Sequence, residues 1–306
     1  MKTKGLRLII GLMLIACSAI GQVISSFKTS DGESLFYTRM GHGPVIIFLC
    51  GGPGYSVNFL QPWADSLSSD FECILFDQRG TGLSSKVRLD STTINLVVAA
   101  RELEDLRIHL GQKQLILCGI SWGGGLAQVY ASYYPENLKE MVLISTMGPD
   151  LTFLQTFRDN IRMRRYPNER DSLLFWNKQP AGKDADIKKL LFQQLPYFYD
   201  HNAGYRIILK DFANMSYSPQ VSDLMWKDIN KNYDLKSRLI KYKGICIVFK
   251  SRQDVIPESV AYEIKELLPQ TRIISIEKSG HYPHLENPDL FYPNLKKALL
   301  TPEQIR

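Results

Sequence analysis

The sequence predicts an α/β fold with a mostly parallel sheet, helices on both faces and an inserted helical cap. Short runs rich in β-branched residues alternate with helical patterns along most of the chain, which is typical of a parallel sheet covered by helices. One stretch, residues 150–239, contains no convincing strand. A structureless loop of that length is rare inside a compact domain, so we expect helices there.

The sheet is expected to begin with a hairpin, because residues 23–29 and 34–40 flank Asp31-Gly32, a common turn pair. Six later runs lack polar alternation, as strands buried on both faces do. These runs are residues 45–49, 73–76, 115–118, 141–145, 245–249 and 272–276.

Helices are expected between these strands. Leu96, Leu103 and Leu106 recur at helical spacing before the 115–118 run. A later helix lies between Pro257 and Pro269, since proline is favoured at a helix start and excluded from its interior. Together, the elements divide the chain into a core of residues 22–149 and 240–306 and a cap of residues 150–239, after a signal peptide of residues 1–21.

The first 21 residues are typical of an export signal, with a basic start, an apolar run and small residues at the end. Cleavage after Gly21 and lipidation at Cys17 both fit this pattern, and an uncleaved helix is a third alternative. Cleavage is favoured because strand-like sequence begins at Val23. We predict an exported protein, periplasmic or extracellular, that contacts a membrane only if Cys17 is lipidated.

Charge and composition exclude several classes of protein. With 44% hydrophobic and 22% charged residues, the chain is neither disordered nor a many-span membrane protein. Lys2, Lys4 and Arg7 account for half of the net charge of +6. No basic stripe interleaved with aromatic residues follows, so we expect no nucleic-acid partner.

The cysteines after the signal lie in or at the end of apolar strand-like runs. They are Cys50, Cys73, Cys118 and Cys246. We expect buried free thiols, as is usual for cysteines in such runs. Because export would permit a disulfide, Cys50 with Cys118 is the pair to check.

The strongest chemical signal is Gly119-Ile120-Ser121-Trp122-Gly123, directly after a predicted strand and before a helical stretch. A nucleophilic serine on such a tight turn needs glycines on both sides, because side chains there would meet neighbouring backbone. The helix opens with three glycines, although each costs about 1 kcal/mol relative to alanine. We therefore predict that Ser121 is a nucleophile; a structural serine in a glycine turn is the alternative.

A serine nucleophile needs a base, and the base needs an orienting acid. His281 follows the last predicted strand, where a loop would present it beside Ser121. Asp254 precedes this histidine in the chain and follows the preceding strand, and Asp150 is the alternative acid. The order Ser121, Asp254, His281 is that of α/β hydrolases.

An oxyanion hole requires two backbone donors, and losing one typically lowers the rate about 100- to 1,000-fold. The N–H of Trp122 is the first candidate. The second lies in the glycine-rich loop after the 45–49 strand, where Gly52 is favoured over Gly51.

Four motifs together resemble the proline iminopeptidases and related aminopeptidases of α/β-hydrolase fold. They are Gly51-Gly52-Pro53-Gly54, Asp77-Gln78-Arg79-Gly80-Thr81-Gly82-Leu83-Ser84, the elbow at Ser121 and Gly280-His281-Tyr282-Pro283. The resemblance spans about residues 23–291. It implies hydrolysis of a small peptide at its free N-terminal residue, preferentially proline, without a metal or cofactor. The chain departs from the family at Cys50, where histidine is usual.

The substrate depends on the cap. The related aminopeptidases use cap glutamates to hold the α-ammonium of the substrate, and Glu169 is the only glutamate in the cap of this chain, which makes it the candidate substrate-binding residue. Aspartates at 159, 171, 200, 211, 223 and 228 are alternatives. The cap is also rich in aromatic residues, which would suit a proline ring or an acyl chain.

The first hypothesis is thus an aminopeptidase acting on a short peptide. The second is a carboxylesterase or lactonase that uses the same three residues. The third is a ligand-binding protein on a hydrolase scaffold.

Overall fold

A computed structural model describes residues 21–212 and 215–300. Residues 1–20, which carry most of the predicted signal peptide including Cys17, lie outside the described residues. In the described part of the chain, none of the helices has the length and apolar character needed to cross a membrane.

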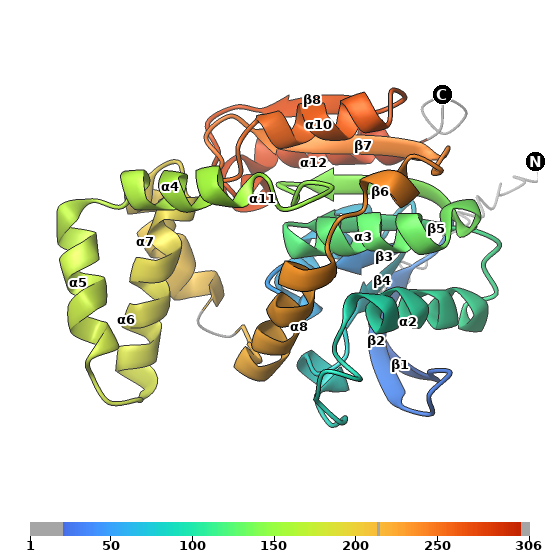
Figure 1. The fold of residues 1–306 in the computed structure, drawn as a ribbon, viewed down its shortest axis with the longest axis horizontal. Helices are drawn as coiled ribbons and strands as arrows, with labels where there is room; N and C mark the ends of the chain where they lie inside the picture. The colour runs from blue at the N-terminus through green and yellow to red at the C-terminus, as the bar shows by residue number, and fades with distance from the viewer. Residues whose placement is uncertain (1–20, 213–214, 301–306) are drawn as a thin grey trace, which may run out of the picture.

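Eight strands form one sheet in the order β1-β2-β4-β3-β5-β6-β7-β8 (Figure 1). They are β1 (Val23–Lys28), β2 (Ser34–Gly41), β3 (Val45–Leu49), β4 (Glu72–Phe76), β5 (Leu115–Ile120), β6 (Leu138–Ile144), β7 (Ile245–Ser251) and β8 (Arg272–Ile276). β2 pairs antiparallel with β1 and β4, and all other pairs are parallel. The mostly parallel sheet and all eight predicted strands are confirmed.

The central strands are buried on both faces because apolar side chains occupy successive positions. Ile47 and Leu49 of β3 enter one hydrophobic cluster, and Ile46 and Phe48 enter the other. Side chains alternate across a strand, so these two clusters lie on opposite faces of the sheet. This double burial explains the absence of polar alternation in the sequence.

Helices cover both faces. α2 (Leu96–His109), α3 (Trp122–Tyr133) and α10 (Ser259–Leu267) pack into the first cluster, whereas α1 (Gln61–Leu67) and α12 (Pro288–Leu299) pack into the second. α2 begins after Asn95, whose side chain accepts a hydrogen bond from Val98 N at 2.9 Å, an N-cap that the leucine spacing alone does not reveal.

Among the described residues between β6 and β7, the regular structure is helical, apart from one isolated bridge between Tyr55 and Tyr217. Its helices are α4 (Leu154–Arg164), α5 (Pro167–Asn177), α6 (Lys183–Gln194), α7 (His201–Ile207), α8 (Pro219–Asn232) and α9 (Lys236–Leu239). In Figure 1, α5 and α6 lie side by side away from the sheet. α8 contacts α2 and belongs to the core cluster.

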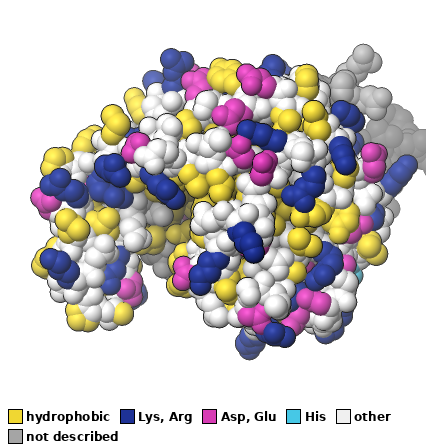
Figure 2. All heavy atoms as spheres, in the orientation of Figure 1, with side chains coloured by type: hydrophobic (Ala, Val, Ile, Leu, Met, Phe, Trp, Pro, Cys, Tyr) yellow, Lys and Arg dark blue, Asp and Glu magenta, His cyan; other side chains and the backbone are white. Residues whose placement is uncertain are grey.

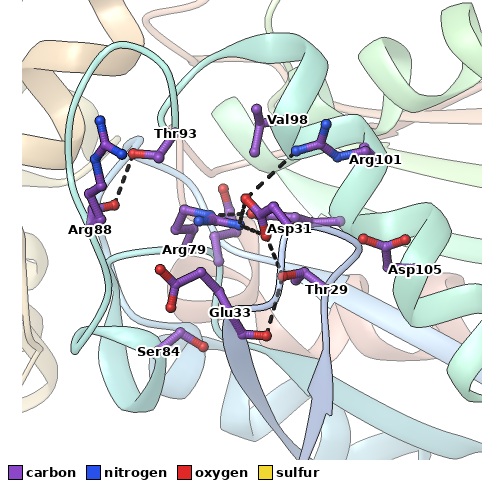
Figure 3. A network of polar contacts seen from close by, with 12 residues as sticks. Thr29, Asp31, Glu33, Arg79, Ser84, Arg88, Thr93, Val98, Arg101 and Asp105 are labelled. Carbon is purple, nitrogen blue, oxygen red and sulfur yellow. Dashed lines mark hydrogen bonds and ion pairs between the residues drawn. The ribbon is translucent and has the colours of Figure 1, made fainter.

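The loop after β4 holds the hairpin and α2 together through a buried arginine. Arg79 donates two hydrogen bonds to the carboxylate of Asp31, at 2.9 and 2.8 Å, and a third to Glu102 of α2. Figure 3 shows Arg79 and Arg101 both directed at Asp31. Because Nη2 serves Asp31 and Nε serves Glu102, one guanidinium holds two carboxylates, which favours arginine over lysine at position 79.

Candidate active site

A pocket of about 260 Å³ lies between the strand ends of the core and the helices that follow β6. Ser121, His281, Gly52 and Trp122 are all on its wall. Figure 2 shows the surface hollowed between the α5–α6 pair and α8, and Gln194 at the end of α6 lines the pocket together with two side chains of α8. Most of the remaining wall is aromatic or aliphatic.

Ser121 sits on a strained turn between β5 and α3, with φ 55° and ψ −118°. Positive φ is uncommon for a residue with a side chain and persists only where the surroundings enforce it. A Cβ at Gly123 would lie 2.0 Å from Leu49 O, and one at Gly119 would lie 2.3 Å from the carbonyl carbon of Gly123. The two glycines therefore allow the turn to pack against β3 and present the serine to the pocket.

His281 and Asp254 meet at the ends of β8 and β7. His281 Nδ1 lies 2.8 Å from Asp254 Oδ1, and each side chain is only 4% exposed. Asp254 Oδ1 also accepts the backbone N–H of Ile256 at 3.1 Å, which orients the carboxylate. In the described residues no hydrogen bond joins the Ser121 hydroxyl to His281, although both face the pocket.

The alternative acid, Asp150, is placed elsewhere. Its carboxylate accepts from Lys236 Nζ at 2.5 Å and from Thr152, and these bonds hold its pKa below the usual range despite partial burial. The structure brings Asp254, and not Asp150, to His281.

The candidate oxyanion donors flank the serine. Gly52 and Trp122 line the pocket, whereas Gly51 does not. A Cβ at Gly51 would lie 3.2 Å from Ser121 Cβ, so glycine there leaves room for the serine side chain.

Gln78 connects the two loops and has no role in the sequence-based prediction. Its Nε2 donates to Cys50 O at 3.1 Å, and its Oε1 accepts from the Trp122 indole at 2.9 Å. This side chain fixes the spacing between the loop that bears Gly52 and the elbow that bears Ser121. The only sequence signal was its place in the motif of residues 77–84.

None of the four cysteines in the described part of the chain lines the pocket. Cys50, Cys73, Cys118 and Cys246 are all buried and free, so the pair Cys50 and Cys118 is not bonded. Burial raises the pKa of Cys50 to about 12, which keeps it a neutral thiol. The buried, free thiol of Cys50 at the start of the loop that bears Gly52 agrees with the sequence-based expectation.

No carboxylate of the described chain lines the pocket, and neither do Lys or Arg. Glu169 is buried in the cap, where it accepts from Tyr166 N at 3.0 Å and pairs with His201 Nδ1 at 2.6 Å. The structure therefore does not bring Glu169 to Ser121. The same is true of the alternative aspartates at 159, 171, 200, 211, 223 and 228. No His, Cys, Asp or Glu of the described chain form a group of three suited to a metal ion.

Residues 44–288 match the family described as the alpha/beta hydrolase fold. This chain belongs to the α/β hydrolase family. Among its relatives, a proline iminopeptidase of Clostridium botulinum is 26% identical over 85% of this chain and 90% of its own length. The resemblance to proline iminopeptidases is thus confirmed.

Solved α/β hydrolase structures show the same fold. A hydrolase from Bacillus anthracis superposes with a TM-score of 0.72 over 91% of this chain and 99% of its own, at 18% identity. An esterase from Exiguobacterium antarcticum gives a TM-score of 0.65 over 89% and 98%, also at 18% identity. At 18% identity, these similarities establish a shared fold.

Proposed function

We propose that this α/β hydrolase is a serine hydrolase that cleaves small esters through an acyl-enzyme on Ser121. The observation that carries the proposal is the meeting of a strained serine and a buried histidine on one pocket, with His281 already hydrogen-bonded to Asp254. In this proposal Ser121 is the nucleophile, His281 the base and Asp254 the acid that orients it.

The reaction has two halves. Ser121 Oγ attacks the ester carbonyl carbon as His281 Nε2 takes its proton, and the backbone N–H groups of Gly52 and Trp122 donate to the oxyanion. The tetrahedral intermediate expels the alcohol, which takes the proton from His281. Water, deprotonated by His281, then attacks the acyl-enzyme, and the carboxylic acid leaves as Ser121 recovers its proton.

The pocket wall supports small esters as the proposed substrate class. An α-ammonium group entering an aromatic pocket loses hydration, and without a carboxylate the wall offsets only part of that loss, through its ring faces. An uncharged acyl group has no such cost. The volume of about 260 Å³ is small for a ligand pocket, which favours short acyl groups. The proposal thus places the esterase before the aminopeptidase, the reverse of the order drawn from the sequence. A lactone is an internal ester, so the same argument covers lactones.

Release of an N-terminal proline is the second candidate, favoured by the relative of that name. The aromatic wall, which includes Tyr55, Tyr217 and Trp226, offers ring faces that could hold a proline ring or, weakly, a cation.

Turnover by the purified mature protein on a matched panel tests the proposal. The panel holds short-chain aryl esters and prolyl and alanyl anilides with free and acetylated N-termini, with Ser121→Ala as blank. We expect Ser121-dependent ester turnover. Turnover only of free-amine prolyl anilide, abolished by acetylation, would establish the aminopeptidase instead. Binding of these compounds without any turnover would favour the ligand-binding alternative and end the catalytic proposal.

We also propose that the protein is exported. Cell fractionation with antibody detection, comparing the native chain with Cys17→Ser, tests this: export without lipidation leaves both in the soluble exported fraction. Membrane retention that Cys17→Ser abolishes would show a lipoprotein, and recovery of both in the cytoplasm would refute export.

A further inference from the structure

Three segments far apart in the sequence meet at His281. They are the loop that bears Asp254, the loop that bears His281, and residues 197–199 of the cap. The first two join directly, because Gln253 N donates to Ser279 O at 3.2 Å. The cap joins the histidine loop where His281 N donates to Tyr197 O at 2.7 Å. The backbone of the candidate base is therefore held by the cap.

Glu286 strengthens the contact between the cap and the histidine loop. Its Oε1 accepts from Gly280 N at 2.8 Å and its Oε2 accepts from Tyr199 N at 2.6 Å. The fit is tight, since a Cβ at Gly280 would lie 2.2 Å from Tyr197 O. One carboxylate thus joins the histidine loop to the cap.

Arg164 makes the matching connection to the aspartate loop. This residue ends α4, the helix that runs from the core to the α5–α6 pair (Figure 1). Its guanidinium donates to Gln253 O, next to Asp254, and to Phe198 O at 2.7 Å. A planar guanidinium can serve two carbonyls at once, which a lysine ammonium does less well.

The side chains of Arg164 and Glu286 lie close enough for their charges to interact. Arg164 interacts electrostatically with Asp254 and Glu286, and burial lowers the pKa of its guanidinium. Burial also raises the pKa of Glu286 to about 7, against the lowering by its backbone donors. Neither side chain lines the pocket, so neither touches a substrate held there.

We propose that Arg164 and Glu286 are positioning residues through which the cap holds His281 and Asp254 in the geometry needed to activate Ser121. The inference rests on the proposed function, because it assigns the cap a part in that same catalytic machinery. We call Arg164 and Glu286 the clamp, and we expect that a substitution in the clamp slows the chemical step without weakening substrate binding. Displacements of about 1 Å in a catalytic group lower rates on the order of 100-fold.

The test uses Glu286→Gln and Arg164→Lys in the full mature protein. The glutamine amide keeps one acceptor oxygen and turns its NH₂ toward a backbone N–H, so one of the two bonds is lost. Asp289→Asn and Arg162→Lys are matched controls at exposed positions on α12 and α4. Three quantities are measured: kcat and KM on the best ester, the second-order rate of Ser121 labelling by a fluorophosphonate, and the downfield proton resonance of the His281–Asp254 pair.

We expect kcat and the labelling rate to fall at least tenfold in each clamp variant, with KM within about twofold and the downfield resonance weakened. The controls should match the native protein. Labelling and kcat within twofold of native, or a change confined to KM, would overturn the proposal. Thermal unfolding reports whether each variant is folded. If Arg164→Lys does not fold, the isosteric variant Glu286→Gln decides the test. A native protein that fails to label at Ser121 would instead refute the proposed function.

Discussion

Replacing Gln194 by glutamate should convert the pocket toward substrates with a free amine. Gln194 lies at the end of α6 on the pocket wall, and its Oε1 accepts from Tyr282 Oη at 2.7 Å. Glutamate has nearly the same size and retains that acceptor. Gln194→Glu therefore adds one negative charge to a wall that has none among the described residues, with little change in packing.

The magnitude follows from the size of the pocket. A volume of about 260 Å³ is roughly 8 Å across, so an ammonium group inside lies about 5 Å from a wall side chain. At an effective dielectric constant of about 20, the attraction is roughly 3 kcal/mol. Loss of carboxylate hydration offsets about half of it, which leaves about 1.5 kcal/mol, or roughly a tenfold change.

The assay compares kcat/KM for alanyl aryl esters with free and acetylated N-termini. We expect the free-to-acetylated ratio to rise about tenfold in Gln194→Glu and less than twofold in Gln193→Glu, a control on the same helix whose side chain is exposed. An unchanged ratio in a variant that retains Ser121-dependent turnover would show that Gln194 does not face the acyl group. An equal rise in Gln193→Glu would show that the general field of the cap, and not the pocket wall, controls selectivity.

Three further predictions concern the elbow, the acid and a buried histidine. Gly123→Ala places a methyl carbon 2.0 Å from Leu49 O and should lower the free energy of unfolding by several kcal/mol, measured by urea denaturation; a loss below 1 kcal/mol would show that the elbow can relax. Asp254→Asn should lower kcat about 1,000- to 10,000-fold while circular dichroism stays native, because His281 loses its charged partner, and a fall of less than tenfold would point to another acid. Burial lowers the pKa of His284 to about 3, so the unfolded chain binds more protons than the folded chain between pH 3 and 6.5. The free energy of unfolding therefore falls as the pH drops below about 6.5, by about 2 kcal/mol at pH 5. His284→Gln should flatten that acid limb in urea titrations at pH 5 and 7, and an unchanged limb would assign it to other groups.

The sequence predicted the sheet well because its signals are local. The hairpin turn and the unbroken apolar runs report how each strand is buried, and a run such as β3 carries that information in five consecutive residues. The glycines around Ser121 are equally local, since the elbow is strained over a few bonds. The sequence predicted the ends of strands less well. β5 runs to Ile120, two residues beyond its expected end, because its pairing with β6 continues to the turn.

The sequence by itself determined the fold and the order of serine, aspartate and histidine along the chain. Only the tertiary structure decided that Glu169 pairs with His201, 32 positions away, and lies off the pocket wall. It also decided that Arg164 reaches the aspartate loop across 89 positions. Gln194 and Tyr282 are joined by a hydrogen bond although 88 positions separate them. Such contacts have no local signal, because they depend on how the cap packs on the core. That packing sets the charge of the pocket wall, on which the proposed substrate class rests.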